Sequence, residues 1–341
     1  MNRILITGAA GFIGFHLCHR LVNDGYKITA VDALIDLGDL WIKNLRVENL
    51  SRLDNIEFIN RDISQYLLSR NLPKFESIIH LAAISGIERF ERKKEWAEEI
   101  TVESAKSVHM HAQKTNTPVI YASSSSVYGN TRCRKFSEDL TCLSPVSSYA
   151  KAKIEVENIF KNISVPTIGL RLFTVYGEYG RPDMSYFKFT ERIYNKKPVT
   201  LYGEKIKRDF TYVGDVVEAV SRIIKKKDHI FARFGRNLTI NIGTGKSTSI
   251  EKIVKIIGSL LAVEPTIKYK EQRPFDLGYT CCDTDFLKRV TGYIPKTCIE
   301  EGLKKFVNWY KYVLPFDLAP TLHSKLENYL GYIVTMKKGK S

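Results

Sequence analysis

Short runs of apolar residues alternate with amphipathic stretches along the first 170 residues of the chain. The apolar runs are rich in Ile, Leu and Val, which is typical of strands buried on both faces. We expect strands at Ile4–Thr7, Ile28–Val31, Ile56–Ile59, Ser77–His80, Pro118–Tyr121 and Thr167–Leu170. Apolar positions at helical spacing predict helices at Phe12–Asn23, Glu88–Lys114 and Ser148–Lys161. This alternation predicts a parallel sheet covered by helices on both faces.

From Gly177 onward the pattern changes to shorter elements separated by Gly and Pro. Shorter elements are expected at Tyr186–Asn195, Val199–Tyr202 and Phe210–Tyr212, and amphipathic helices at Asp215–Lys226, Ser249–Leu261 and Ile299–Tyr312. The sequence therefore predicts an α/β fold, with a Rossmann-type doubly wound parallel sheet and a smaller mixed α/β lobe. After Pro315 the pattern weakens into a basic tail.

A glycine-rich turn follows the first predicted strand. Gly8, Gly11 and Gly14 form a G-x-x-G-x-x-G pattern around Phe12 and Ile13, where a helix is predicted to begin. Glycines there let the backbone approach a pyrophosphate, and the free N–H groups of the helix attract anions. A tight turn alone also needs glycine, so the context matters. The position of the turn at the start of a β-α-β pattern predicts dinucleotide binding.

Acidic residues at the ends of the next two strands refine this prediction. Asp32 ends the second strand, where a carboxylate accepts the ribose hydroxyls and repels a 2′-phosphate, so NAD is favoured over NADP. Asp62 follows the third strand and is expected to contact the adenosine in a similar way.

Tyr149 and Lys153 lie four residues apart, and so on one face of the predicted Ser148–Lys161 helix. An unperturbed tyrosine has a pKa of about 10. A neighbouring ammonium and the positive nicotinamide favour the phenolate, so Tyr149 is a candidate general base. Four serines, Ser123 to Ser126, follow a buried strand at the edge where α/β sheets bind ligands. Any of the four can supply the hydroxyl that hydrogen-bonds a reacting oxygen.

Together these motifs resemble the extended short-chain dehydrogenase/reductases, and most closely the UDP-glucuronate 4-epimerases among the nucleotide-sugar 4-epimerases. The stretches that carry the resemblance are residues 11–17, 80–83, 121–129, 172–177, 180–184 and 208–212. The most discriminating is Gly180-Arg181-Pro182-Asp183-Met184. The resemblance implies epimerisation at C4 of a UDP-sugar through a 4-keto intermediate, with UDP-glucuronate as the substrate and NAD as the cofactor.

The resemblance also implies the roles of individual residues. It implies that Tyr149 is the base, Lys153 its partner and nicotinamide-ribose ligand, and Ser124 the catalytic hydroxyl. It places Ile63, Leu81, Ala82, Ala83 and Val175 beside the cofactor. On the substrate side it implies Ser124 and Ser125 at the sugar, and Thr174 and Arg181 near the substrate carboxylate and phosphate. It also implies Arg208 and Arg273 at the UDP moiety, where a guanidinium fork matches phosphate geometry.

By the same resemblance, residues 1–172, joined by 211–245, form an NAD-binding domain. Residues 173–210 and 246–314 form the substrate lobe, and 315–341 form the basic tail. The family further implies a homodimer, in which the helices predicted at Glu88–Lys114 and Ser148–Lys161 pack as a four-helix interface.

Departures from the family leave alternatives open. Ile84 stands where the family often has Gln, and the loop 32–50 lacks the usual paired tyrosines. Ser125 and Ser126 stand where related 4,6-dehydratases carry an Asp-Glu pair, and Ser126 stands where related decarboxylases carry Glu. Elimination and decarboxylation are therefore disfavoured. A 4-epimerase of UDP-glucose or UDP-N-acetylglucosamine is harder to exclude, whereas a dinucleotide-sensing regulator would need neither Tyr149 nor Lys153.

Composition changes this picture little. The net charge of +15 favours anionic partners, but no nucleic-acid-binding motif accompanies it, so nucleic acid is not expected as a partner. Neither a signal peptide nor a membrane span is recognisable, and six cysteines without metal-ligand spacing indicate reduced thiols in a cytoplasm and no metal. The stretch from Gly243 to Thr248 lacks the first glycine of a P-loop. It is better interpreted as the end of a strand with a Ser/Thr cap for the helix predicted at Ser249–Leu261.

Overall fold

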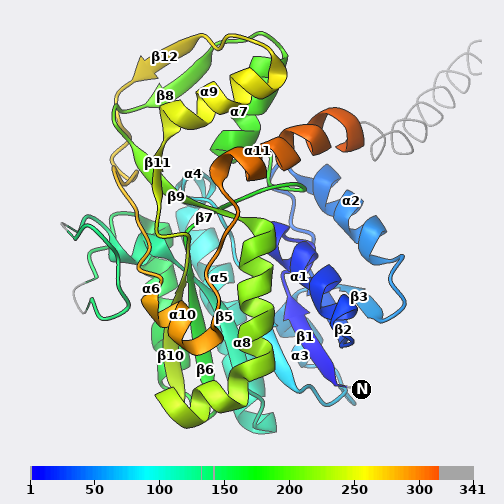
Figure 1. The fold of residues 1–341 in the computed structure, drawn as a ribbon. Coiled ribbons are helices and arrows are strands. Elements are labelled where there is room, and N and C mark those ends of the chain that lie inside the picture. The colour runs from blue at the N-terminus through cyan, green and yellow to red at the C-terminus, as the bar shows by residue number, and fades with distance from the viewer. Residues whose placement is uncertain (1, 132, 141–142, 315–341) are drawn as a thin grey trace, which may run out of the picture.

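A seven-stranded parallel sheet forms the centre of the computed structural model, which describes residues 2–131, 133–140 and 143–314 (Figure 1). Its strands are β1 (Arg3–Thr7), β2 (Lys27–Asp32), β3 (Ile56–Asn60), β4 (Ser77–His80), β5 (Val119–Ser124), β6 (Thr167–Leu172) and β10 (Asn237–Ile242). The spatial order is β10-β6-β5-β4-β1-β2-β3. The chain reverses direction across the sheet between β1 and β4, and ligands of such sheets bind beyond this point. The predicted doubly wound fold is confirmed.

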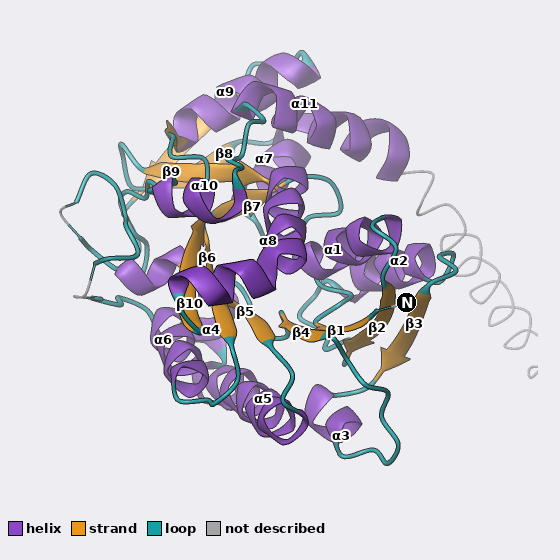
Figure 2. Cartoon of the chain, turned by 60° about the horizontal axis from the view of Figure 1, so that its bottom comes forward, coloured by secondary structure: helices purple, strands orange, loops and turns teal. Residues whose placement is uncertain are grey.

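Helices cover both faces of this sheet, as Figure 2 shows. On one face lie α1 (Phe12–Asn23) and α8 (Val213–Phe234), and on the other α3 (Ile63–Leu67), α5 (Lys94–Thr115) and α6 (Ser148–Lys161). Because side chains of a strand alternate between faces, Ile4 and Ile6 join the first core, whereas Leu5 joins the second. All three side chains are fully buried.

A smaller set of elements lies beyond the carboxyl ends of the strands. A three-stranded mixed sheet has the order β11 (Ser247–Ser249), β9 (Lys207–Tyr212) and β7 (Thr174–Tyr176), and β8 (Val199–Tyr202) pairs with β12 (Ile267–Lys270). The helices here are α7 (Ser185–Tyr194), α9 (Ile250–Leu261) and α11 (Ile299–Asn308). An aromatic core that includes Tyr186, Phe187 and Phe306 joins them. This core holds the second wall of the site against the large sheet.

Several elements differ from the sequence prediction. The helix predicted at Glu88–Lys114 is two helices, α4 (Ile87–Arg92) and α5, because Lys93 leaves the helical region at φ −138° and ψ 51°. α2 (Leu40–Leu50), α10 (Asp285–Thr291) and most of β10 were not predicted, and α8 is longer than the predicted Asp215–Lys226. α11 ends at Asn308 and is followed by a π-helical turn, Trp309–Val313. The Ser/Thr cap expected within Gly243–Thr248 is instead Ser249, whose Oγ accepts the Lys252 N–H at 3.2 Å, so α9 begins one residue later than predicted.

Three further predictions concern a membrane span, the basic tail and the pairing of subunits. Across residues 2–131, 133–140 and 143–314, no helix combines the length and apolar character needed to cross a membrane. The basic tail 315–341 lies outside the described residues. Packing of a second chain against α5 and α6 stays a prediction; light scattering is expected to give twice the chain mass, and a 39 kDa particle would contradict it.

Candidate active site

The glycine turn between β1 and α1 is shaped by contacts that exclude side chains. A Cβ added at Gly8 would lie 2.7 Å from the Ala82 nitrogen, and one at Gly14 would lie 2.2 Å from the Gly8 oxygen. Gly8 also has φ +70°, a conformation that favours glycine. α1 begins at Phe12 directly after this turn, so its free N–H groups face the same space. The turn thus has the close backbone approach and the helix N-terminus that suit a pyrophosphate.

The two predicted acidic residues lie at the same edge of the sheet. Asp32 accepts N–H groups of Ala10 at 3.0 Å and of Leu34 at 2.9 Å, which fixes its carboxylate beside the glycine turn. Asp62 caps α3 by accepting the Ser64 N–H at 2.8 Å, so one of its oxygens serves the helix. Both residues line the cavity.

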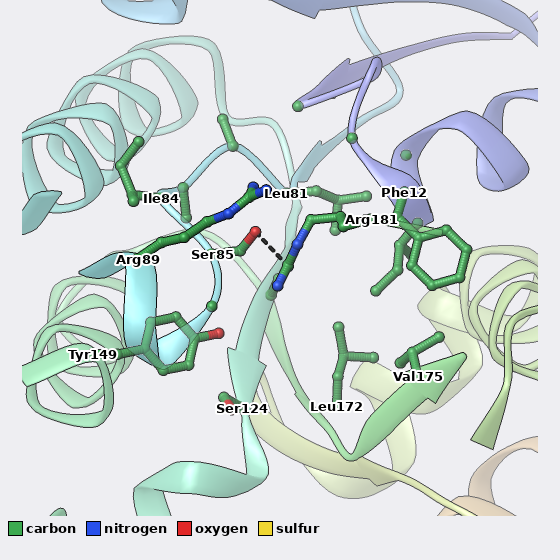
Figure 3. Close-up of a pocket in the computed structure, with 18 of the residues that line it drawn as sticks. Phe12, Leu81, Ile84, Ser85, Arg89, Ser124, Tyr149, Leu172, Val175 and Arg181 are labelled. Carbon is green, nitrogen blue, oxygen red and sulfur yellow. Dashed lines mark hydrogen bonds between the residues drawn. The ribbon is translucent and has the colours of Figure 1, made fainter. Parts of the chain in front are cut away.

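One continuous cavity of about 380 Å³ runs from this turn to the elements of the smaller lobe. It is lined by every site residue predicted from sequence except Arg273. Phe12, Leu81, Leu172 and Val175 form its apolar middle, and Tyr149, Ser124 and Arg181 approach it from different elements (Figure 3). The cavity therefore joins a phosphate-binding turn to a polar end with titratable groups.

Tyr149 and Lys153 come from the first turns of α6. The Lys153 Nζ lies 5.9 Å from the Tyr149 ring centroid and donates to the Ala122 carbonyl at 3.0 Å. Burial lowers the pKa of Lys153 to about 8, although the Glu157 carboxylate acts in the opposite direction. Burial raises the pKa of Tyr149, while the nearby Ser124 hydroxyl and the positive charge of Arg181 favour its phenolate. A positive charge added near the phenol, such as a nicotinamide, would lower this pKa further.

The structure separates the four serines that the sequence left equivalent. Ser123 points away from the cavity centre into a buried network, where its Oγ donates to Glu157 at 2.5 Å. Glu157 is also held by Arg171 through two hydrogen bonds of 2.8 Å. Ser124 acts to lower the pKa of Tyr149, and its Oγ accepts a hydrogen bond from the Ser126 hydroxyl at 2.9 Å. This geometry favours Ser124 as the hydroxyl that meets a reacting oxygen.

At the opposite wall, Arg181 is held by side chains from two loops. Its Nε and Nη2 contact the two oxygens of Asp183 at 3.0 and 3.2 Å, and its Nη1 donates to Ser85 at 2.6 Å. Thr174, the first residue of β7, lines the same end of the cavity. Arg181, Thr174 and Tyr149 thus border one space, as the resemblance implied.

The two arginines predicted at the UDP phosphates differ in position. Arg208 on β9 lines the cavity, and burial lowers its pKa to about 10, with Arg273 adding to the effect. Arg273 does not line the cavity; it is held by Asp276 at 2.7 Å and by Glu88 of α4 at 3.1 Å. A role of Arg273 at the phosphates would require it to leave Glu88, so this role stays a prediction.

Several residues at the site were not predicted. Arg89 and Asp39 line the cavity and form an ion pair of 2.7 Å, and Ser85 accepts a hydrogen bond from Arg181. We call the end of the cavity that holds Arg181, Arg89 and Asp39 the sugar end. Arg46 on α2 is fully buried and donates to the carbonyls of Tyr179 and Ala10. A signal for Arg46 was present, since an arginine on the apolar face of a helix pattern requires a partner. For Arg89 and Asp39 no such signal exists in the sequence, because the two residues meet only through the fold.

Acidic and metal-binding groups are few at this site. Among the described residues, no cluster of three or more His, Cys, Asp or Glu suits a metal ion. The carboxylates that line the cavity within the described chain are Asp32, Asp39 and Asp62. None of the three lies in the Ser124–Ser126 segment, where an elimination reaction would need its acid and base.

Comparisons with known proteins agree with this geometry. Residues 4–243 match the model of the NAD dependent epimerase/dehydratase family. A UDP-glucuronate 4-epimerase of Thermodesulfobacterium geofontis is 32% identical over 337 residues, 91% of this chain and 97% of that protein. An uncharacterised protein of Methanocaldococcus jannaschii is 37% identical over 321 residues, 91% and 96% of the two chains. The crystal structure of UDP-glucuronic acid 4-epimerase from Bacillus cereus, in complex with UDP-glucuronic acid and NAD, has a TM-score of 0.83 at 27% identity, with 91% and 99% covered.

Proposed function

Because the chain belongs to the NAD dependent epimerase/dehydratase family, we propose that it epimerises C4 of a UDP-linked sugar and that its substrate is UDP-glucuronate. The predicted family, the NAD cofactor and an enzyme of the epimerase class are confirmed by this membership. The observation that carries the choice of sugar is the position of Arg181, which faces the same space as Tyr149 and Ser124 (Figure 3).

The residues present suit NAD. The turn at Gly8, Gly11 and Gly14 would hold the pyrophosphate, and Asp32 would accept the adenosine ribose hydroxyls. Lys153, whose side chain is 4% exposed, would bind the nicotinamide ribose. When bound, NAD⁺ supplies the hydride acceptor and later the hydride donor for the sugar C4, so the reaction needs no net oxidant.

Tyr149 acts as the general base in this proposal. Its phenolate takes the proton of the sugar O4 while the C4–H bond breaks, and it returns the proton when hydride adds to the other face of the 4-ketone. Ser124, which lines the cavity together with Tyr149, holds O4 within reach during both steps. The ring must turn between them, and contacts of the UDP moiety with Arg208 keep the intermediate bound.

An acidic sugar imposes a second task on the site. The 4-keto form of glucuronate is a β-keto acid, which loses CO₂ when the C5–C6 bond aligns with the carbonyl π system. We infer that Arg181 and Thr174 hold the carboxylate away from this alignment. The placement of Arg181 near Tyr149, in the same cavity, supports that role.

NMR of the sugar anomeric protons tests the proposal. Incubation of the purified protein with UDP-glucuronate and NAD⁺ is expected to yield UDP-galacturonate, and Tyr149→Phe is expected to abolish the product. UDP-xylose would indicate decarboxylation and contradict the role of Arg181. Turnover of UDP-glucose or UDP-N-acetylglucosamine alone would keep the base and reject the acidic substrate.

A further inference from the structure

An alternating row of charged side chains leads to Arg181 along the sugar end of the cavity. Arg89 Nη1 lies 2.7 Å from Asp39 Oδ2, and Arg89 Nη2 lies 3.0 Å from Asp183 Oδ1. Asp183 in turn holds Arg181 through both oxygens. The members come from the segment before α2, from α4 and from the segment before α7. The proposed chemistry so far uses neither Arg89 nor Asp39.

We propose that Arg89 and Asp39 are positioning residues that make the site selective for a sugar carboxylate, by fixing Arg181 and keeping its positive charge available. The inference deepens the proposed function and rests on it. It concerns how Arg181 is held, and it assigns neither Arg89 nor Asp39 a contact with the substrate.

Charge balance supports the need for Arg89. Asp183 alone would neutralise Arg181 and leave little attraction for a second carboxylate. Burial acts to raise the pKa of Asp183, but Arg181, Arg89 and Lys188 outweigh it and hold this pKa below its usual value. In the row itself, Arg89 and Arg181 face Asp39 and Asp183. Without Arg89, two carboxylates would face the single guanidinium of Arg181, which would weaken its attraction for an anionic group.

The geometry also fixes the direction in which Arg181 can bind. A guanidinium has five N–H donors, and Asp183 and Ser85 engage three of them, on Nε, Nη1 and Nη2. One N–H on each terminal nitrogen is left, which suits a second carboxylate. A Cβ at Gly86 would lie 2.8 Å from Arg181 Nη2, so the glycine makes room for this orientation.

The burial and the hydrogen bonding of Asp39 fit a positioning role. Its side chain is 1% exposed, and within the described chain its Oδ1 has no hydrogen-bond partner. A buried carboxylate with one unpaired oxygen is unfavourable for folding. Asp39 nevertheless pairs with Arg89, so we infer that its role is to hold the Arg89 side chain in position.

Loss of the fixed orientation has a defined chemical consequence. If the carboxylate turns, CO₂ leaves the 4-keto intermediate: the C5–C6 bond breaks, its electron pair becomes the enolate of the ketone, and C5 of the enolate takes a proton. The product is a UDP-linked 4-ketopentose. Its yield relative to UDP-galacturonate therefore reports the orientation, which overall stability of the protein does not change.

The experiment compares wild type with Arg89→Met, Arg89→Lys and Asp39→Asn, and uses Arg92→Met as the matched control. Arg92 lies on the same helix, is 73% exposed and pairs with Glu88. Affinities for UDP-glucuronate and UDP-glucose are measured on NAD-loaded protein, and products are quantified by NMR. We expect Arg89→Met to weaken binding of UDP-glucuronate roughly tenfold or more while UDP-glucose changes less than about twofold.

The other variants sharpen this result. The ketopentose fraction is expected to rise several-fold in Arg89→Met and Asp39→Asn, less in Arg89→Lys, and not in Arg92→Met. Equal losses for the two UDP-sugars, with an unchanged product ratio, would overturn the inference and leave the proposed function intact. A wild type that does not prefer UDP-glucuronate would instead contradict the proposed function, and with it the carboxylate that these residues are proposed to orient.

Discussion

The cavity has a nucleotide end, where Gly8, Gly11 and Gly14 would hold NAD, and a sugar end at Arg181. The two ends exclude an added side chain in different ways. At the nucleotide end, a Cβ at Gly14 would meet the Gly8 oxygen at 2.2 Å and the Ala9 Cα at 2.9 Å, which are both backbone atoms. At the sugar end, a Cβ at Gly86 would meet Arg181 Nη2 at 2.8 Å and Asp183 Oδ2 at 3.1 Å, which are ends of side chains. Backbone within a βα turn cannot move aside, whereas a side chain can change its rotamer.

The difference indicates which property depends on which end. The nucleotide end is built from main chain on a buried sheet, so its shape is inseparable from the fold. The sugar end is built from charged side chains of separate segments, so its selectivity can change while the fold stays. Changes at the first end should therefore affect cofactor binding and stability together, and changes at the second should affect the choice of substrate.

Gly14→Ala is expected to have the largest effect. The added methyl has no room beside the Gly8 oxygen, so the turn must open, at a cost of about 3 kcal/mol in the free energy of unfolding and with loss of bound NAD. Chemical denaturation and the cofactor content of the purified protein measure both. Gly278→Ala serves as the control, since its Cβ would meet no atom within 4 Å. Retention of NAD by Gly14→Ala would contradict the conclusion that cofactor binding and stability change together at the nucleotide end.

Tyr149→Phe is expected to lower kcat by about 10²–10⁴, since it removes the proton acceptor while it keeps the ring that packs on Phe90. The thermal unfolding temperature and the NAD content should match wild type. Single-turnover kinetics and cofactor fluorescence measure the two quantities. A variant that keeps more than a tenth of wild-type kcat would remove Tyr149 from the base position.

Lys153→Met is expected to reveal a pH-dependent cost of the buried ammonium. The folded-state pKa of Lys153 is about 8, below its ordinary value of 10.5, so the unfolded chain binds one more proton between these pH values. Wild-type stability contributed by this group therefore rises with pH over that window, by up to about 3 kcal/mol. The stability of Lys153→Met relative to wild type should be greatest below pH 8 and should decline toward pH 10. Urea unfolding at pH 7, 8, 9 and 10 measures it, and a constant difference would contradict the buried charge.

Gly86→Ala is expected to change the choice of substrate more than binding of NAD. Because Gly86 has φ +98°, an alanine there is strained, and we expect a loss of about 2 kcal/mol in the free energy of unfolding. Displacement of Arg181 should reduce the preference for UDP-glucuronate over UDP-glucose by roughly tenfold, about 1.4 kcal/mol. NAD content should be unchanged, in contrast to Gly14→Ala. Competition binding with both UDP-sugars measures the ratio, and loss of NAD from this variant would show that the two ends are not separable.

The difference between the two ends also explains which features could be predicted from the sequence. Strand and helix periods and the glycine spacing gave the sheet and its nucleotide turn, because both follow from local pattern. Of β10, only the end near Gly243 was expected. Asn237 to Ile242 alternates polar and apolar residues, as a strand at the edge of a sheet does, and so differs from the apolar runs by which the other strands were recognised. The break at Lys93 was missed because no Gly or Pro marks it. Asp39 and Arg89, 50 residues apart, meet through tertiary packing that no local pattern encodes.

The interruption at Lys93 also separates two kinds of evolutionary constraint. Downstream, α5 buries Ala97, Ala105 and Val108 against the rest of the fold, so substitutions there disturb packing. Upstream, α4 buries Phe90 and carries its charges at the cavity rim or in solvent. Substitutions that change the charges of this short helix can thus change the preferred sugar during evolution, while the packing of the long helix and of the sheet is kept.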